Sequence, residues 1–420
     1  MKKIYLSLFI DGDTAMTMAA TKTENGVIIP LCAETEHISP ANKCGLTTIN
    51  DDTRLTVSRL IHKIVNKIEG NNEVTGIYLG IMPRSMHSET VEVRRDFNGK
   101  HRITENDIDK LDREIGKGIN DIIVAKYDNG FLRDGVEARY VRNELADYVV
   151  RKCLAVVVSP RHSLDYHELF PANIRLHSVV PTQVAIARVV ADEEQRVNGV
   201  ISFHIGNQSS GLTYISDDYV KGTAVVPFGF DHILKDMTLD EVPVEKIRSF
   251  VESSRMKYKW AAGTTMRFSS EGPIFNLSNS IEAFNARIRE IFSLGYDRIL
   301  ASLNLQELKA PVIVTSSFIN TPEFAEAISA LIEQDCTLGN AANVLNDDNF
   351  AAHRFIPLIA VLNEATNVCI EERTVDINEF AEDEDKAAAA AAKEEVKKNE
   401  KKKSIFDFFK EQTLKFNDED

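Results

Sequence analysis

The residues with the clearest chemical pattern lie at the C-terminal end of the chain. The basic members of this segment are Lys401, Lys402 and Lys403, and the apolar members directly downstream are Ile405, Phe406, Phe408, Phe409 and Phe416. On a helix, four of the five apolar side chains fall within an arc of roughly 100°, with Phe406 on its flank. Each lysine near an anionic membrane surface contributes about 1 kcal/mol. The pattern predicts an interfacial membrane-targeting helix over residues 404–416. A helix that packs on its own domain or on a partner is the alternative.

A charged segment over residues 373–403 precedes this helix. It holds an acidic run at residues 382–385, six alanines at 387–392 and a lysine-rich stretch at 393–403. This order of charges complements a helix dipole, which favours a semi-rigid helical spacer. A disordered charged linker is the alternative. Because one short amphipathic helix binds lipid only marginally, polymerisation of the body would have to strengthen attachment through avidity.

The body of the chain alternates strand and helix patterns. In the first half we predict a strand at Lys3–Ile10, a polar turn at 11–14 and a second strand that ends at 24–26, followed by a helix at 53–69 and a strand at 74–81. A helix that starts with a capping box at 104–107 and a strand at 154–158 come next. In the second half we predict a strand-turn-strand unit at 199–226, a strand at 311–315 and a helix from about 323 to 333. The second half repeats the hairpin, helix and strand of the first. We therefore expect two related lobes around a cleft.

Composition limits the class of protein. The chain has 420 residues, is 43% hydrophobic and carries a net charge of −15, so we expect more than one globular domain and no nucleic-acid partner. No apolar run approaches the roughly 20 residues that cross a bilayer, and no signal-peptide cleavage site follows the N-terminal strand, which favours a cytosolic protein. Five dispersed cysteines predict reduced thiols rather than disulfides or a metal site.

Several segments together resemble FtsA, the actin-like bacterial protein that tethers the division ring to the membrane. They are Val74–Ile81 followed by Ile103–Ile108, the hairpin Gly199–Ile215, the segment Val225–Ile233 and the terminal amphipathic helix. The resemblance implies an α/β, actin-like (ribonuclease H-like) two-lobed fold with an inserted subdomain. It divides the chain into a first lobe core at 1–81 and 155–180, an inserted subdomain at 82–154, a second lobe core at 181–229 and 306–372, a peripheral subdomain at 230–305, the linker at 373–403 and the helix at 404–416.

The resemblance also implies partners and a location. We expect the body to self-associate into filaments, to bind membrane lipids and other division proteins, and to lie at midcell on the cytoplasmic face of the membrane. The C-terminal tail of the tubulin-like FtsZ would dock on residues 230–305, where Arg287, Arg289 and Arg298 could meet an acidic peptide. An ordinary solvated face is the alternative for these arginines.

The phosphate-binding loops depart from the family pattern. In the first hairpin, Asp11 aligns with the family's aspartate and is followed by Asp13 and Thr14, but Asp13 stands at the critical glycine. The second hairpin has His204 in place of the first aspartate and keeps Gly206, Ser209 and Ser210. The adenosine loop has Ser316, Ser317 and Phe318 in place of glycines.

Glycine is needed in such loops because it lets backbone amides approach an anion. We therefore predict a pseudo-ATPase that has no catalytic residues, no metal site and no nucleotide cofactor. A weak anion nest at Gly206, Ser209 and Ser210, which would retain ATP and magnesium, is the alternative. A weakly active ATPase and a pilus or secretion scaffold of the same fold remain the alternative functions.

Overall fold

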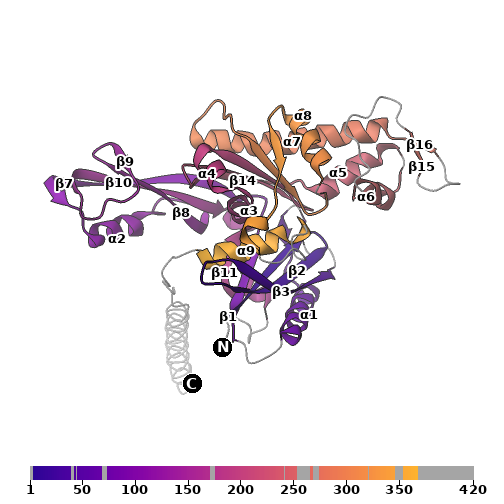
Figure 1. The fold of residues 1–420 in the computed structure, drawn as a ribbon, viewed down its shortest axis with the longest axis horizontal. Helices are drawn as coiled ribbons and strands as arrows, with labels where there is room; N and C mark the ends of the chain where they lie inside the picture. Colours follow the sequence, from indigo (N-terminus) through magenta and orange to yellow (C-terminus); the bar gives the residue numbers. More distant parts are fainter. Residues whose placement is uncertain are drawn as a thin grey trace, which may run out of the picture. The chain divides into compact units, whose positions relative to one another are not determined.

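The structure is a computed structural model (Figure 1). It describes residues 3–38, 42–43, 45–68, 73–170, 176–240, 242–252, 265–267, 274–319, 321–345 and 353–367. These belong to one compact unit, Met1–Asn367. The predicted linker at 373–403, the predicted helix at 404–416 and all eight predicted membrane-binding residues lie outside the described residues.

The first sheet has five strands in the order β11-β6-β1-β2-β3. Their bounds are β1 Lys3–Asp11, β2 Thr14–Lys22, β3 Ile28–His37, β6 Glu73–Ile81 and β11 Leu176–Pro181. β1 pairs with β2 in antiparallel and with β6 in parallel orientation. From Leu6 onward every residue of β1 is buried, as expected of a central strand covered on both faces. The predicted hairpin is confirmed, with Gly26 at a positive φ of 86° in the β2–β3 connection.

The second sheet repeats this order. β12 (Val200–Ile205), β13 (Ser210–Ser216) and β14 (Tyr219–Val226) form an antiparallel meander, and β17 (Val312–Ser316) and β18 (Cys336–Leu338) extend it in parallel beyond β12. Helices α3 (Thr182–Val190) and α9 (Ile356–Asn367) pack against each other, α3 on the second sheet and α9 on the first (Figure 1). The predicted repetition of a hairpin unit in two lobes is thus confirmed.

An inserted segment extends the second sheet. It comprises β7 (His87–Arg102), α2 (Glu105–Glu114), β8 (Ile122–Arg133), β9 (Val136–Ala138) and β10 (Leu145–Val158). β7 continues the second sheet beyond β14 through the residue pair Ala224 with His87, beside which the N–H of Val225 donates to the carbonyl of Met86 at 2.9 Å, so the order runs β14-β7-β10-β8-β9. The segment has its own small core around Leu111 and Phe131.

Two sequence predictions in this segment have clear outcomes. The predicted capping box is confirmed, because Thr104 and Asp107 bond each other's backbone N–H groups. The strand predicted at 154–158 is longer, since β10 begins at Leu145 and runs through the proposed subdomain boundary at 154/155. Its first half mixes buried residues with exposed and half-buried ones and therefore lacks the continuous apolar run that marked the second half.

The remaining elements complete the two lobes. They are α1 Asp51–Lys67, α4 Glu193–Asn198, α5 Phe230–Asp236, α6 Val244–Glu252, α7 Ser278–Leu303 and α8 Pro322–Ile332; the short strands β4 Asn42–Lys43, β5 Leu46–Thr47, β15 Thr265–Arg267 and β16 Ile274–Asn276; and 3-10 turns at Pro160–His162, Tyr166–Leu169, Met237–Asp240, Ala342–Val344 and His353–Phe355. The predicted helices at 53–69 and 323–333 correspond to α1 and α8. Within the described ranges, no helix combines the length and apolarity needed to span a bilayer.

Gly295 tests the packing of α7 on the second sheet. A Cβ added there would lie 2.4 Å from Leu212 Cδ1 on β13. We expect Gly295→Ala to lower the free energy of unfolding by about 1 kcal/mol, because overpacking costs about 1–3 kcal/mol and exceeds the gain of about 1 kcal/mol in helix propensity. Urea unfolding measures this, with Ser293→Ala at an exposed position of the same helix as the control. Equal or greater stability of Gly295→Ala would contradict the packing.

Candidate functional site

The turns of the two hairpins meet through a buried carboxylate. Asp11, at the end of β1, is only 4% exposed. Its Oδ2 accepts a hydrogen bond from the backbone N–H of Asn207 at 2.6 Å, and its Oδ1 accepts one from Gln208 at 3.2 Å. Consecutive backbone N–H groups form an anion-binding concavity, and here a side chain of the same chain provides the anion.

Each turn also packs a glycine against a side chain of the other turn. Gly12 has a φ of +66°, and a Cβ there would lie 2.2 Å from Asn207 Nδ2. A Cβ on Gly206 would lie 3.0 Å from Asp11 Oδ2 and 2.7 Å from the carbonyl oxygen of Ser209. Glycine is therefore required at both positions by contacts within the chain.

Burial changes the acidity of Asp11. It raises the pKa of this carboxyl from 3.8 to about 7, against the two backbone N–H donors, which lower it; the neighbouring carboxylates of Asp231 and Asp13 raise it further. Asp11 therefore titrates close to neutral pH.

The other predicted loop positions in the hairpins bond within the chain. The Ser209 hydroxyl donates to the carbonyl of Met82 at 3.1 Å, and the Ser210 hydroxyl to that of Phe228 at 2.8 Å. The N–H of Gly206 donates to the carbonyl of Ser209 at 3.1 Å. In the first hairpin, Thr14 donates to Asp13, whose other carboxylate oxygen lies 3.6 Å from His37 Nδ1.

The third loop starts beside the second hairpin, because Ser316 pairs with Ile205 across β17 and β12. The Ser316 hydroxyl accepts from the N–H of Phe318 at 3.1 Å. The Ser317 hydroxyl is buried with no hydrogen-bond partner among the described residues. Phe318 stacks on Phe230 of α5, with ring centroids 4.7 Å apart.

His204 lies between these loops, on β12. Its Nδ1 is 3.0 Å from Thr315 Oγ1, and the residue is 1% exposed. Burial lowers the pKa of His204 from 6.5 to about 4, so the imidazole is neutral at physiological pH. A neutral ring here provides neither the charge nor the oxygen ligands that magnesium prefers.

The three arginines predicted to dock a partner all have contacts within the chain. Arg287 pairs with Asp236 and Glu290, each at 2.6 Å. Arg289 donates to the carbonyl of Leu331 at 3.2 Å, and Arg298 donates to that of Val225. These contacts give each arginine a structural role, and docking by them stays a prediction.

Sequence reasoning missed a linkage from the second hairpin to the α5–α6 region. Gln208 Nε2 donates to Asp231 Oδ2 at 2.6 Å, and Arg248 pairs with Asp231 Oδ1 at 2.7 Å. The three residues are distant in sequence and belong to no local pattern that could have indicated the contact.

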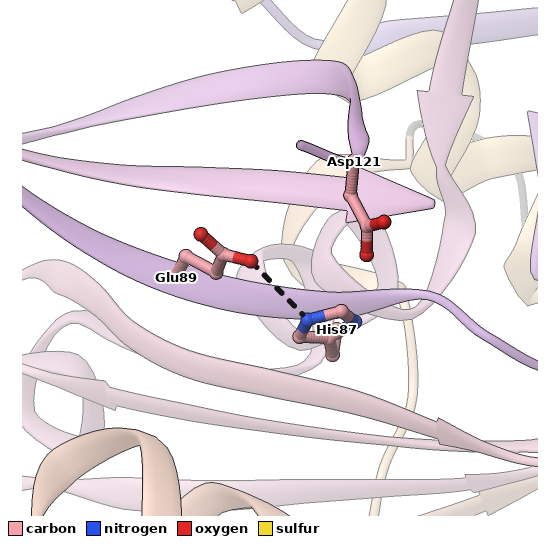
Figure 2. A group of neighbouring side chains, drawn as sticks. All are labelled: His87, Glu89 and Asp121. Atoms are coloured by element: carbon pink, nitrogen blue, oxygen red, sulfur yellow. Dashed lines mark ion pairs between the residues drawn. The ribbon is translucent and has the colours of Figure 1, made fainter. Parts of the chain in front are cut away.

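A second missed group consists of His87, Glu89 and Asp121 (Figure 2). One potential ligand atom from each lies within 4.8 Å of the others, and His87 Nε2 is 3.6 Å from Glu89 Oε1. Asp121 comes from the loop before β8, so sequence spacing gave no signal. All three side chains are half-buried, a setting in which such pairs commonly occur without an ion, and we assign no ligand to them.

Asp11 and His204 predict opposite pH dependences. The raised pKa of Asp11 gives stability that is complete below pH 3.8 and is lost as the pH rises towards 7. The lowered pKa of His204 gives stability that is complete above pH 6.5 and is lost as the pH falls through 4. The two effects oppose each other in the unmodified chain.

We therefore expect Asp11→Asn to gain stability relative to the unmodified chain between pH 4 and pH 7, by on the order of 4 kcal/mol at most. Urea unfolding at both pH values measures the difference. Asp13→Asn, at a half-exposed position of the same turn, should show no comparable change. Parallel pH profiles for Asp11→Asn and the unmodified chain would show that Asp11 does not titrate as described.

Comparison with known proteins bears on the fold and the family. No protein-family model matches the chain. The cell division protein FtsA of Porphyromonas gingivalis is 20% identical over 396 residues, which cover 90% of this chain and 82% of that protein.

Solved structures bear on the fold alone. The PilM–PilN type IV pilus biogenesis complex matches with a TM-score of 0.55 at 9% identity, over 86% of this chain and 98% of the other. The ethanolamine utilization protein EutJ of Carboxydothermus hydrogenoformans matches with a TM-score of 0.47 at 10% identity, over 86% and 89%. The predicted actin-like fold is confirmed. The chain therefore has an actin-like fold and is similar in sequence to the division protein FtsA along 90% of its length.

Proposed function

We propose that this protein is a membrane-tethering scaffold of the division machinery whose nucleotide cleft is inactive. The observation that carries this proposal is the similarity to FtsA along 90% of the chain. On this proposal, residues 230–305 bind the C-terminal tail of FtsZ, the body self-associates, and residues 404–416 hold it on the cytoplasmic face of the membrane at midcell.

Contacts between the hairpins support the loss of nucleotide chemistry. Phosphoryl transfer depends on backbone amides that hold the phosphates and on a positioned metal ion. The Asp11 carboxylate already accepts from the N–H groups of Asn207 and Gln208, and when ionised it repels a phosphate. His204 stands where the family resemblance places a metal-orienting aspartate, and its buried ring is neutral.

The third loop supports the same proposal. The family resemblance places glycines at 316–318, where a flat backbone would face an adenosine. Here Phe318 stacks on Phe230 at an interplanar angle of 7°, and the guanidinium carbon of Arg248 lies 5.8 Å from each ring. Two aromatic rings thus form the kind of stacked pair that a bound base would otherwise make with a side chain.

The terminal segment supports membrane attachment. Three consecutive lysines and five apolar side chains give it the charge and the apolar area of an interfacial helix. Because one such helix binds weakly, self-association of the body would supply the second contribution to binding.

A scaffold of the pilus machinery is the second candidate. The fold match to the PilM–PilN complex favours it, whereas the long sequence match is to a division protein. Imaging of the fluorescently tagged chain separates the two, because bands at midcell indicate division and envelope foci away from midcell indicate secretion.

The inactive cleft predicts that the purified chain binds no fluorescent ATP at micromolar concentrations with magnesium and releases no phosphate. The physical reason is that Asp11 accepts from the backbone N–H groups that would bind the phosphates, His204 replaces the metal-orienting aspartate with a neutral ring, and Phe318 stands in the adenosine loop. Fluorescence titration measures binding, and saturation at micromolar ATP would contradict the proposal. Asp11→Asn separates the causes: binding only in this variant would assign the exclusion to the carboxylate, and binding in neither would assign it to the other two residues.

The membrane role predicts that Phe408→Glu with Phe409→Glu reduces co-sedimentation with anionic liposomes by at least about tenfold, because each buried phenylalanine contributes about 1.5–3 kcal/mol. Leu414→Glu, on the opposite side of the predicted helix, is the matched control and should bind nearly as the unmodified chain does. Equal binding by the double phenylalanine variant and the unmodified chain would rule out this segment as the anchor.

A further inference from the structure

A cavity of about 240 Å³ lies where the inserted segment meets the second lobe. Its wall includes Tyr127, Arg139, Arg188, Arg196, Asp218 and Tyr219. These residues come from β8, the loop after β9, α3, α4 and the β13–β14 turn (Figure 1). We propose that this cavity binds a small oxyanion, a phosphate or carboxylate group, between the three guanidinium groups. The site is separate from the hairpin turns and does not depend on the proposed function.

The guanidinium groups have hydrogen-bond donors beyond those that their contacts use. Arg139 meets Asp218 Oδ2 at 3.3 Å, and Arg196 meets Asp218 Oδ1 at 2.9 Å and donates to the carbonyl of Ala191. Arg188 meets Glu364 Oε1 at 3.1 Å. A guanidinium carries five N–H donors in a planar fork that suits carboxylate and phosphate oxygens, and these contacts use one or two on each.

The charges around the cavity also favour an anion. Asp218 is shared between two arginines, and Glu364 pairs with the third. The other carboxylate in the wall, Asp128, pairs with Arg151. Among the lining residues, three guanidiniums thus face two carboxylates, Asp128 and Asp218, while Glu364 and Arg151 pair with lining residues from outside the cavity wall.

The β13–β14 turn holds Asp218 in place. Asp217 and Asp218 both have positive φ, 55° and 64°, a conformation in which a two-residue turn normally has asparagine and glycine. Their N–H groups donate to the carbonyls of Val197 and Arg196 at 3.0 Å. A strained turn, anchored at the end of α4, thus presents a carboxylate to the same guanidiniums that would hold the ligand.

Tyrosines form the rest of the wall and limit the ligand to a small one. Tyr127 is 8% exposed, and burial together with the neighbouring Glu364 carboxylate, which its hydroxyl bonds, raises the pKa of Tyr127 well above 10, so its ring is a neutral part of the wall. The Tyr219 ring lies 5.7 Å from the guanidinium carbon of Arg139. Because drug-sized sites have volumes of about 300–1,000 Å³, this cavity suits inorganic phosphate or pyrophosphate better than a nucleotide.

Calorimetric titration of the full chain with phosphate, pyrophosphate and succinate, at constant ionic strength, tests the site. We expect saturable binding of at least one of these anions, and the preferred anion identifies the oxyanion class. Arg139→Gln combined with Arg196→Gln should weaken binding by at least about tenfold. Arg142→Gln, which removes a surface arginine paired with Glu105 at 3.1 Å, should leave it unchanged.

Asp218→Asn gives the most specific test. Asparagine tolerates positive φ as well as aspartate does, so the turn is kept while the competing charge is removed. We expect binding to tighten by about threefold to tenfold, whereas a purely structural role for the ion pairs predicts no gain. The proposal is overturned by an absence of saturable binding in both the unmodified chain and Asp218→Asn, or by equal binding in the double arginine variant.

Discussion

One buried carboxylate fixes how the two hairpin turns meet. Asp11 accepts from the N–H groups of Asn207 and Gln208, and through Gln208 the contact continues to Asp231 and Arg248. Backbone N–H groups that would otherwise need a bound anion or water are satisfied within the chain, which stabilises the turns. Burial raises the pKa of Asp11 to about 7, because the cost of burying the carboxylate exceeds the opposing effect of the two N–H donors, which lower this pKa. The Asp11 carboxylate thus joins the two hairpin turns.

Asp218 is a second carboxylate that holds two segments of the chain together, where the inserted segment meets the second lobe, and it is more exposed to solvent than Asp11. Its carboxylate faces guanidiniums rather than backbone N–H groups, and its side chain is 36% exposed beside a cavity, whereas Asp11 is 4% exposed. A solvated carboxylate can be displaced at little cost, since its charge is already partly hydrated. The buried Asp11 carboxylate cannot move out of its contacts unless the two hairpin turns around it separate. The two sites therefore differ in whether an external anion can compete.

The sequence allowed prediction of features with a local cause. Alternation and turn residues marked β1, β2 and their turn, the Thr104–Asp107 spacing marked the start of α2, and the repeated unit marked two lobes. The substitutions at Asp13, His204 and Phe318 were visible against the family pattern. The sequence did not show which groups meet at the hairpin turns, because the contact of Asp11 with Asn207 joins residues 196 positions apart. The contacts of Asp231 with Gln208 and Arg248, and the group of His87, Glu89 and Asp121, were likewise not predicted because their members are not adjacent in sequence. The start of β10 was not predicted because it lacks the apolar run that marks the end of this strand.

These contacts also indicate how parts of the chain are held together. Two glycines of the hairpin turns leave no room for a Cβ: one added at Gly12 would lie 2.2 Å from Asn207 Nδ2, and one added at Gly206 would lie 3.0 Å from Asp11 Oδ2. Close-packed contacts of this kind resist gradual displacement. The inserted segment continues the second sheet through the pair of Ala224 with His87. It is also held by hydrogen bonds of Ser88 with the backbone of Thr223 and by the Arg139–Asp218 ion pair. On the proposed function, a scaffold that no longer opens and closes with nucleotide would keep its two lobes fixed by the glycine contacts at the hairpin turns.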